Sequence, residues 1–321
     1  MRTYWLMTTI LGLLLAAGCV HAQQRYPTKP IRLIVAFAPG GPADIVARML
    51  ASKLTETFKQ SVVVDNRPGG GGRIGTETAV RADSDGYTML IVSAAQAASA
   101  ALYKLPYNPV DDVAPIALIG ETGYMVTLHP SVPVKSIKEL IAYDKANPGK
   151  LNYGTGGTGG ASHLATELFN QMAGTRMTHV PYKGLGPALN DLLGGQIQLV
   201  VVGFNQIFPH IKSNRLRGIA VTTAKRSNAV PDMPTVAETV PGYEVVGWYG
   251  VLGPRALPKD IVARWNREID RIVQLPDVKE RMAGDGLEPV GGSPERLREV
   301  LERDITKWQK VVKIANIKPG S

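Results

Sequence analysis

The sequence predicts an α/β protein of two domains, each built around a parallel sheet. Short β-branched apolar runs alternate with segments whose apolar residues recur at helical spacing, from Ile31 to Val202. Glycine or proline punctuates the strand-to-helix transitions. Without its leader the chain has about 300 residues, which exceeds the common size of one domain. Its 44% hydrophobic content is enough to fill two cores.

The first domain begins with alternating strands and helices. Strands are predicted over residues 31–37, 61–65 and 87–92. A helix follows the first strand, and a glycine-rich segment at 67–75 opens a second helix. Ser93 and Ala94 follow the third strand, at the start of an alanine-rich segment, and are included among the candidate ligand-binding residues. The apolar face of the first helix carries Ile45, Val46, Met49, Leu50, Leu54 and Phe58.

A second set of elements begins near Tyr124. Strands are predicted at 125–128, 151–153, 177–180, 197–202 and 216–222. Helices are predicted at 161–172 and 187–193, and a further helix has Ser136 as its N-cap. The C-terminal part supplies helices at 261–273 and 294–315, the latter with Ser293 as cap and Pro294 at its first position. We therefore expect a discontinuous first domain, residues 23–122 and 224–321, and an inserted second domain, residues 123–223.

The N-terminus has the order of regions typical of an export signal. Arg2 precedes an apolar run at residues 4–18, and the small residues before Gln23 suit cleavage after Ala22. No later stretch approaches 18 consecutive apolar residues. Residues 1–22 are thus predicted to be a signal peptide and the mature protein to be periplasmic. The alternative is lipid anchoring at Cys19, whose preceding residues approximate a lipoprotein processing box.

Composition excludes several classes of protein. Cleavage after Ala22 removes Cys19, the one cysteine, so neither disulfides nor thiol chemistry support the mature chain. The 36 basic residues become 35 without Arg2, against 27 acids, and the net charge falls from +9 to +8. These basic residues are dispersed among acids, which disfavours a nucleic-acid interface. The excess of basic residues suits a protein that collects anions, although an ordinary soluble surface is the favoured explanation.

A glycine-rich loop at residues 154–163 is the most informative segment. It leads directly into a helix, whose first turn leaves backbone donors unpaired and carries the positive end of the helix dipole. An anion can be held there by backbone N–H groups and hydroxyls. The candidate ligand-binding residues are Gly154, Thr155, Gly156, Thr158, Gly159, Ser162 and His163.

A second loop occupies the same strand-to-helix position in the first domain. Its candidate residues are Phe37, Ala38, Pro39, Gly40, Gly41 and Asp44. Asp44 is either a ligand contact or an acid that complements the helix dipole. In open α/β sheets ligands bind beyond the carboxyl ends of the strands, so two facing loops would form an interdomain cleft. Because neither loop contains lysine or arginine, backbone groups are expected to hold the charge.

Other chemistries find little support. Gly154, Gly156 and Gly159 match the dinucleotide fingerprint, but the next strand ends in Pro181 where a ribose-binding acid is expected. The histidines form no metal-binding spacing, and Ser162 has no recognisable base partner. His163 could contact a ligand or make a structural hydrogen bond, and His179 is read as a core residue. We expect no cofactor, no metal and no enzymatic activity.

The sequence resembles the periplasmic receptors of tripartite tricarboxylate transporters, the Bug-type binding proteins. The matching segments include Pro39-Gly40-Gly41 with Asp44, Asn66-Arg67-Pro68-Gly69, Asp85-Gly86-Tyr87-Thr88, Tyr153-Gly154-Thr155-Gly156, Val180-Pro181-Tyr182-Lys183-Gly184 and Trp248-Tyr249-Gly250. The resemblance implies a periplasmic-binding-protein (type II, Venus flytrap) fold, with two α/β domains joined by crossover strands. It also implies a small carboxylate ligand, such as a di- or tricarboxylate or an aromatic acid, and a membrane permease as partner.

One segment departs from the family pattern. Where many relatives carry Met-Phe-Asp, this chain has Val201-Val202-Gly203, and Val202 and Gly203 are included among the candidate ligand-binding residues. The missing acid disfavours a ligand amino group. We expect a monomer that closes about a hinge near residues 120–124 and 216–222. A sensor subunit that presents ligand to a signalling protein is the alternative role, and a secreted hydrolase is a less favoured one, which would need a nucleophile-base pair.

Overall fold

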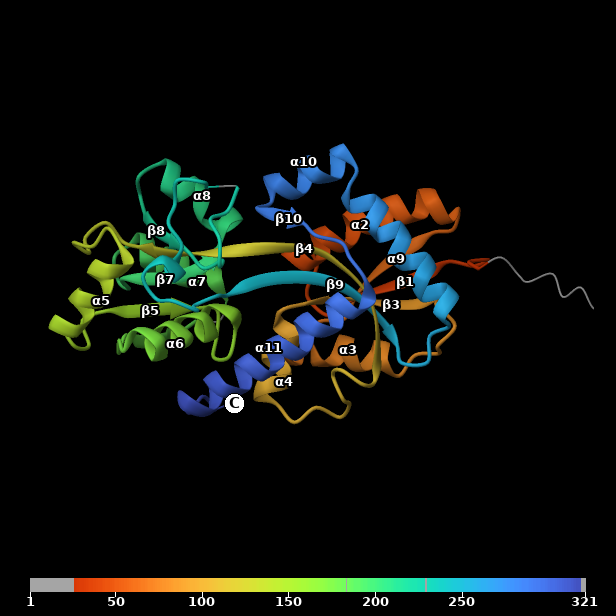
Figure 1. Ribbon diagram of the computed structural model, residues 1–321, viewed down its shortest axis with the longest axis horizontal. Helices are drawn as coiled ribbons and strands as arrows, with labels where there is room; N and C mark the ends of the chain where they lie inside the picture. Colours follow the sequence, from red (N-terminus) through yellow and green to blue (C-terminus); the bar gives the residue numbers. More distant parts are fainter. Residues whose placement is uncertain (1–25, 183, 229, 319–321) are drawn as a thin grey trace, which may run out of the picture.

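Two lobes connected by long strands make up the protein (Figure 1). The computed structural model describes residues 26–182, 184–228 and 230–318. The predicted signal peptide, Cys19 and Lys183 lie outside the described residues.

The first lobe opens with parallel strands and intervening helices, as predicted. Its central strand, β1, pairs in parallel with β2 on one side and β3 on the other. The elements are β1 (Ile31–Val35), α2 (Pro42–Phe58), β2 (Val62–Asn66), a 3₁₀ turn (Gly70–Gly72), α3 (Arg73–Val80), β3 (Thr88–Ser93) and α4 (Ala95–Leu102).

The second lobe repeats the pattern around β5, which pairs in parallel with β6 and β7. Its elements are α5 (Ile137–Ala146), β5 (Asn152–Thr155), α6 (Ala161–Ala173), β6 (Thr178–Pro181), α7 (Leu185–Leu193), β7 (Leu199–Gly203), α8 (Phe204–Lys212) and β8 (Arg217–Val221). The helix α8 was not predicted.

The chain then returns to the first lobe. The remaining elements are a 3₁₀ turn (Val236–Glu238), β9 (Val246–Pro254), α9 (Lys259–Val273), α10 (Pro276–Gly284), β10 (Leu287–Pro289) and α11 (Pro294–Ile314). The Ser293 hydroxyl accepts the Arg296 N–H at the start of α11, so the predicted cap is present.

The strand β4 (Val113–Leu128) joins the two lobes. Its first part pairs antiparallel with β9 and its last part, from Tyr124, pairs antiparallel with β7 and β8. The sheets are therefore mixed rather than purely parallel, because the joining strands run against their neighbours. Sequence analysis placed only the last four residues of this strand, because Gly120 and Gly123 interrupt its apolar run near the midpoint.

The return crossing lies later than the sequence suggested. Strand β8 stays in the second lobe beside β4, and the Tyr243 hydroxyl donates to the Ala165 carbonyl of α6. The Val245 N–H donates to the Thr222 carbonyl before β9 begins. The chain thus crosses at residues 120–124 of β4 and again near 245–247, not at 216–222. The predicted domain division stays a prediction.

Buried helix faces hold the layers together. In α2 the residues Val46, Leu50 and Leu54 are buried against the sheet, as their spacing predicted. Each fully buried side chain of this size contributes about 1.5–3 kcal/mol. Helix α11 crosses the junction of the lobes, and Trp248 at the start of β9 donates its indole N–H to the buried Asp304 of α11 at 2.8 Å. Among the described residues, no helix is both long and apolar enough to cross a membrane.

Candidate functional site

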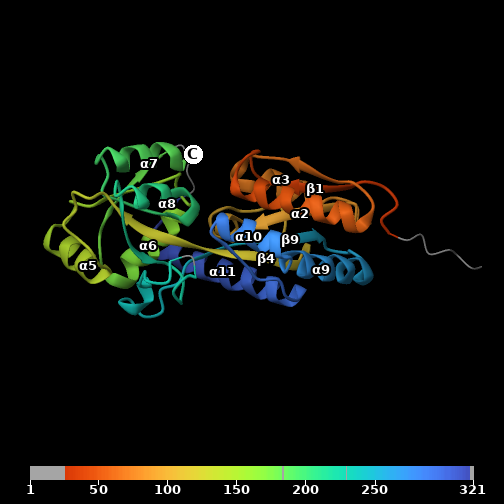
Figure 2. The same ribbon diagram turned by 90° about the horizontal axis from the view of Figure 1, so that it is seen from above.

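A cavity of about 840 Å³ lies between the two lobes. The views in Figures 1 and 2 show α2 of the first lobe and α7 and α8 of the second on the two sides of this junction. The cavity volume falls within the usual range for small-molecule sites. The first lobe contributes the loop after β1, the second lobe contributes the loops before α6, α7 and α8, and the joining strands supply Thr122, Tyr124 and Tyr249.

Four helices begin at the cavity wall. Their N-caps are Gly41 for α2, Gly160 for α6, Gly184 for α7 and Gly203 for α8, and all four glycines line the cavity. None of these four helices has a side-chain cap. Because the first turn of a helix lacks intrahelical acceptors and carries partial positive charge, the four ends together suit a negatively charged group.

The loop after β1 is held from inside by Asp44. This carboxylate is 2% exposed and accepts the Gly40 N–H at 2.9 Å, together with Nε of Arg48 and Nδ2 of Asn66. Hydrogen bonding to Arg48, above all, lowers the pKa of Asp44 to about 2. The Asn66 amide also donates to the Phe37 carbonyl. Asp44 therefore fixes the loop and does not line the cavity.

The loop before α6 is held from inside by a histidine pair. The Gly159 N–H donates to Nδ1 of His163 at 2.9 Å, and the His163 ring stacks on His179 with ring centroids 3.8 Å apart. His179 Nε2 lies 2.7 Å from the Thr155 hydroxyl. Burial lowers the pKa of both histidines to about 4, so both rings are neutral near pH 7. The His179 ring also stacks on Tyr153, so the Tyr153 ring supports the histidine pair that holds the loop.

The structure brings together part of the predicted set. The predicted residues that line the cavity are Phe37, Ala38, Pro39, Gly40, Gly41, Ser93, Gly156, Ser162, Val202 and Gly203. Those outside the lining are Asp44, Ala94, Gly154, Thr155, Thr158, Gly159 and His163. The Gly40 and Gly159 N–H groups are occupied within their own loops. The Ser162 hydroxyl donates to the Val201 carbonyl at 2.6 Å.

Several lining residues were missed by sequence reasoning. They come from the joining strands, from the C-cap of α10, from the start of β10 and from the starts of α7 and α8: Thr122, Tyr124, Leu185, Gly186, Gln206, Tyr249, Asp285 and Leu287. A motif search based on strand-to-helix loops does not reach residues on long strands. The Trp248-Tyr249-Gly250 run was the available signal for one of them.

The charge of the lining is asymmetric. Among the described lining residues, no side chain is lysine, arginine or histidine, and Asp285 is the acid. Anion binding at this cavity would therefore depend on the N-termini of the helices. Lys183 lies outside the part of the chain that the structure describes. Likewise, no group of three or more metal-binding side chains occurs among the described residues.

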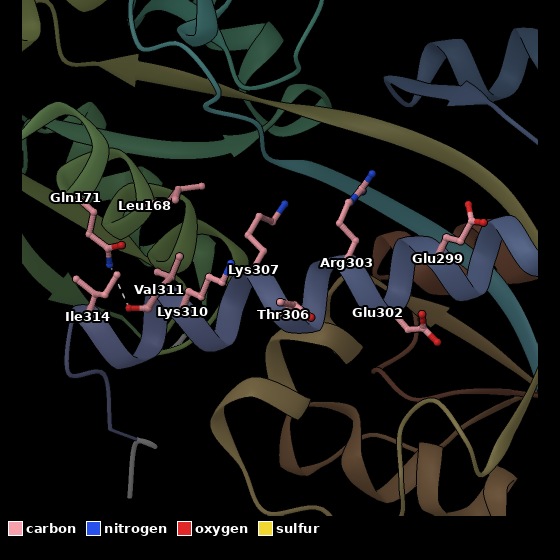
Figure 3. Close-up of a pocket in the computed structure, with 10 residues that line it drawn as sticks. All are labelled: Leu168, Gln171, Glu299, Glu302, Arg303, Thr306, Lys307, Lys310, Val311 and Ile314. Atoms are coloured by element: carbon pink, nitrogen blue, oxygen red, sulfur yellow. Dashed lines mark hydrogen bonds between the residues drawn. The ribbon is translucent and has the colours of Figure 1, made fainter.

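Another cavity, of about 680 Å³, lies on the outer face of α11 (Figure 3). It is bounded by α6 and α11, which are joined by a hydrogen bond from the Gln171 side chain to the Val311 carbonyl. Its charged residues are both acidic, such as Glu299 and Glu302, and basic, such as Lys310. Since none of the glycine loops contributes to it, this cavity is not the candidate site.

Comparison with known proteins identifies the family. The family model described as the tripartite tricarboxylate transporter family receptor matches residues 46–317. The chain belongs to this receptor family. It is 34% identical to the protein BugT of Bordetella pertussis, over 96% of both chains.

Solved structures of related proteins agree in fold. A protein of R. palustris solved with adipate has a TM-score of 0.80 and 36% identity, with 92% of this chain and all of that chain covered. The periplasmic binding protein BugD has a TM-score of 0.76 and 35% identity, covering 91% and 99% of the two chains. MatC from Rhodopseudomonas palustris with bound malate has a TM-score of 0.76 and 29% identity, covering 89% and 100%. The predicted periplasmic-binding-protein fold and family are confirmed.

Proposed function

We propose that this receptor captures a small carboxylate between its lobes and delivers it to a tripartite tricarboxylate-type permease. The observation that carries the proposal is the convergence of four uncapped helix N-termini on one cavity between the lobes. Such ends hold an anion through backbone N–H groups and dipoles without needing a buried cation.

The relatives support a carboxylate as ligand. One related structure holds adipate and another holds malate, and both ligands are carboxylates. The family is named for its transporter, which supports a permease as partner. The same proposal includes export directed by residues 1–22, a periplasmic location, a monomeric state and a binding role without catalysis.

Closure of the lobes is the expected response to ligand. Each lobe contributes part of the lining, so both walls contact one solute only when they approach each other. The chain crosses between the lobes at β4 and at the start of β9, and these crossings are the proposed hinge. Small-angle scattering should show a smaller radius of gyration with saturating ligand, and no change would indicate a rigid pocket.

A thermal-shift screen tests the function directly. The mature protein would be heated with mono-, di- and tricarboxylates, aromatic acids, and uncharged amides of the same shapes. A carboxylate present at 100 times its dissociation constant should add about 2.7 kcal/mol of stability, and its amide should add none. If no carboxylate stabilises the protein while uncharged compounds do, the proposal is wrong.

A further inference from the structure

The strands that cross between the lobes supply one wall of the cavity, the floor, formed by Thr122 and Tyr124 of β4 and Tyr249 of β9. In the antiparallel pairing of these strands, Thr122 lies opposite Gly247 and Gly120 lies opposite Tyr249. Residues opposite each other, and residues two apart in one strand, have side chains on the same face of a sheet. The three floor residues therefore share one face, which is the face turned to the cavity.

The opposite face of the same strands packs on α11. Glu121 and Trp248 alternate with the floor residues and are paired with each other in register. The Trp248 indole N–H donates to the buried Asp304 of α11. One face of the crossing strands is thus occupied by protein, and the floor is left to whatever fills the cavity.

The Tyr124 ring lies across β9. A Cβ added at Gly247 would lie 2.9 Å from the Tyr124 hydroxyl oxygen and 3.3 Å from its Cζ. Because Gly247 and Tyr249 are two apart on one face, the phenol of Tyr124 ends over the strand that carries Tyr249. Burial, above all, raises the pKa of both phenols, that of Tyr249 to about 12, and Tyr249 further raises the pKa of Tyr124. Both hydroxyls are therefore protonated donors near pH 7.

These two hydroxyls have no acceptor within the protein. Neither the Tyr124 nor the Tyr249 hydroxyl makes a hydrogen bond with any residue that the structure describes. The Thr122 hydroxyl, in contrast, donates to the Gly286 carbonyl at 2.8 Å. The Ser93 hydroxyl, which lies opposite Tyr249 in register and was predicted to contact ligand, also has no partner among the described residues. Since half-buried O–H groups are satisfied by an acceptor, a ligand that fills the cavity is the available source of one.

We propose that the phenols of Tyr124 and Tyr249 form a second polar subsite, which donates to an oxygen of the ligand other than the carboxylate held by the helix N-termini. The receptor then prefers acids with a second oxygen-bearing group, such as a hydroxyl or another carboxylate, to alkyl acids of the same length. This inference rests on the proposed function, and it makes the two tyrosines specificity residues.

Matched acids test the subsite. Calorimetric titration would compare hexanoate with 6-hydroxyhexanoate and adipate, and butanoate with 2-hydroxybutanoate, 4-hydroxybutanoate and succinate. In the wild type the best oxygen-bearing acid should bind about tenfold more tightly than the alkyl acid of equal length, equivalent to about 1.4 kcal/mol. Phenylalanine keeps each ring and removes the hydroxyl, so Tyr124→Phe combined with Tyr249→Phe should reduce this advantage to about threefold or less. The affinity for the alkyl acid should stay near that of the wild type.

Tyr143→Phe is the matched control. Tyr143 lies on α5 outside the cavity lining, and its hydroxyl makes no hydrogen bond with any residue of the described part of the chain. This variant should keep the wild-type ratio of affinities. Thermal unfolding without ligand establishes that each variant is folded.

Each outcome decides between the two levels of the proposal. If the alkyl acid binds as tightly as its oxygen-bearing partners, or if the double variant keeps the wild-type ratio, the subsite is overturned while carboxylate binding stands. If the double variant weakens all acids equally, the phenols bind the first carboxylate and the inference is again overturned. If no acid of either series binds, the inference is overturned, and the wider carboxylate screen decides the proposed function separately.

Discussion

The two glycine loops of the cavity share a geometry but differ in the chemistry that supports it. In each, a loop N–H donates to a side chain four residues later in the first turn of the helix: Gly40 to Asp44 in the first lobe, and Gly159 to His163 in the second. The first acceptor is an ionised carboxylate paired with Arg48, and the second is a neutral imidazole stacked on His179.

This difference shows how a binding loop can be preorganised in two ways. Both acceptors occupy a donor inside the loop and fix its shape before ligand arrives, which reduces the ordering cost of binding. The ion pair of the first loop stays charged over a wide pH range, because the pKa of Asp44 is lowered to about 2. The second loop depends on rings that must remain neutral. The lobes should therefore differ in their sensitivity to acid.

The largest effect is expected from Asp44→Ala. The substitution leaves the Gly40 N–H and the Asn66 amide without their buried acceptor and removes the partner of Arg48. We expect the free energy of unfolding to fall by about 3 kcal/mol. Urea denaturation measures this change. Asp277→Ala, which removes an ion pair between the exposed Asp277 and the half-buried Lys53, is the control and should change little. Equal losses in the two variants would refute the special role of Asp44.

A matched glycine pair gives the next largest effect. Gly40 and Gly159 both have φ of +79°, so alanine is strained at either position. A methyl group at Gly40 meets no atom within 4 Å, whereas one at Gly159 would lie 2.2 Å from Cδ1 of Leu102, at the end of α4. Gly40→Ala should cost about 1 kcal/mol and Gly159→Ala about 2 kcal/mol.

The excess cost at Gly159 can be assigned to this contact between the lobes. Gly159→Ala combined with Leu102→Ala should be less destabilised than the sum of the two single variants predicts. Strict additivity in thermal and urea unfolding would mean that Leu102 does not limit the space at Gly159.

A further effect concerns pH. Because the pKa of His163 and His179 falls from an ordinary value of 6.5 to about 4, the unfolded chain binds protons in this window while the folded pair does not. The stabilising contribution is complete above pH 6.5 and is lost as the pH falls through 4. The contribution of Asp44 is lost only below its ordinary value of 3.8, as the pH falls through about 2.

Urea unfolding at pH 7, 5.5 and 4.5 would distinguish the acid sensitivity of the two loops. His163→Asn keeps an acceptor for Gly159 but does not titrate, so stability should depend less on pH than in the wild type. His210→Asn on α8, outside the stack, should keep the wild-type slope. A slope unchanged in His163→Asn would show that the pair does not confer acid sensitivity.

The sequence predicted the parts of the fold that have local signals. The apolar spacing of α2, the caps Ser136 and Ser293 and the glycine loops all depend on residues close together in the chain. The path of β4 and β9 depends on pairing across more than 100 residues, which no local pattern encodes. For the same reason Tyr124, Tyr249 and Asp285 could not be assigned to the site.

The loops themselves show a second limit. Glycine and threonine indicate an anion site, but the pattern cannot say which N–H groups face the cavity and which are used internally. The Gly159 N–H falls in the second class because His163 accepts its hydrogen bond, and the Thr155 hydroxyl is likewise used internally, in a hydrogen bond with His179. The sequence contains these histidines, but it does not show that they stack.

The central claim, anion binding by helix ends between the lobes, can be tested with two N-cap variants. Gly41 and Gly160 have extended backbone angles with φ of −78° and −70°, and the nearest atoms to an added Cβ lie at 3.5 and 3.4 Å. Aspartate fits there and is a favourable N-cap, so Gly41→Asp and Gly160→Asp should keep or raise stability. Each places a negative charge beside the bound carboxylate and occupies the donors of that helix.

Calorimetric titration with the acid that most stabilises the wild type is the deciding measurement. The account predicts that Gly41→Asp and Gly160→Asp each weaken binding about 100-fold or more, equivalent to about 2.7 kcal/mol. Ser136→Asp, the same kind of change at the N-cap of α5 away from the cavity, should bind like the wild type. Wild-type affinity in both glycine variants, with their folds intact, would contradict binding at the helix ends.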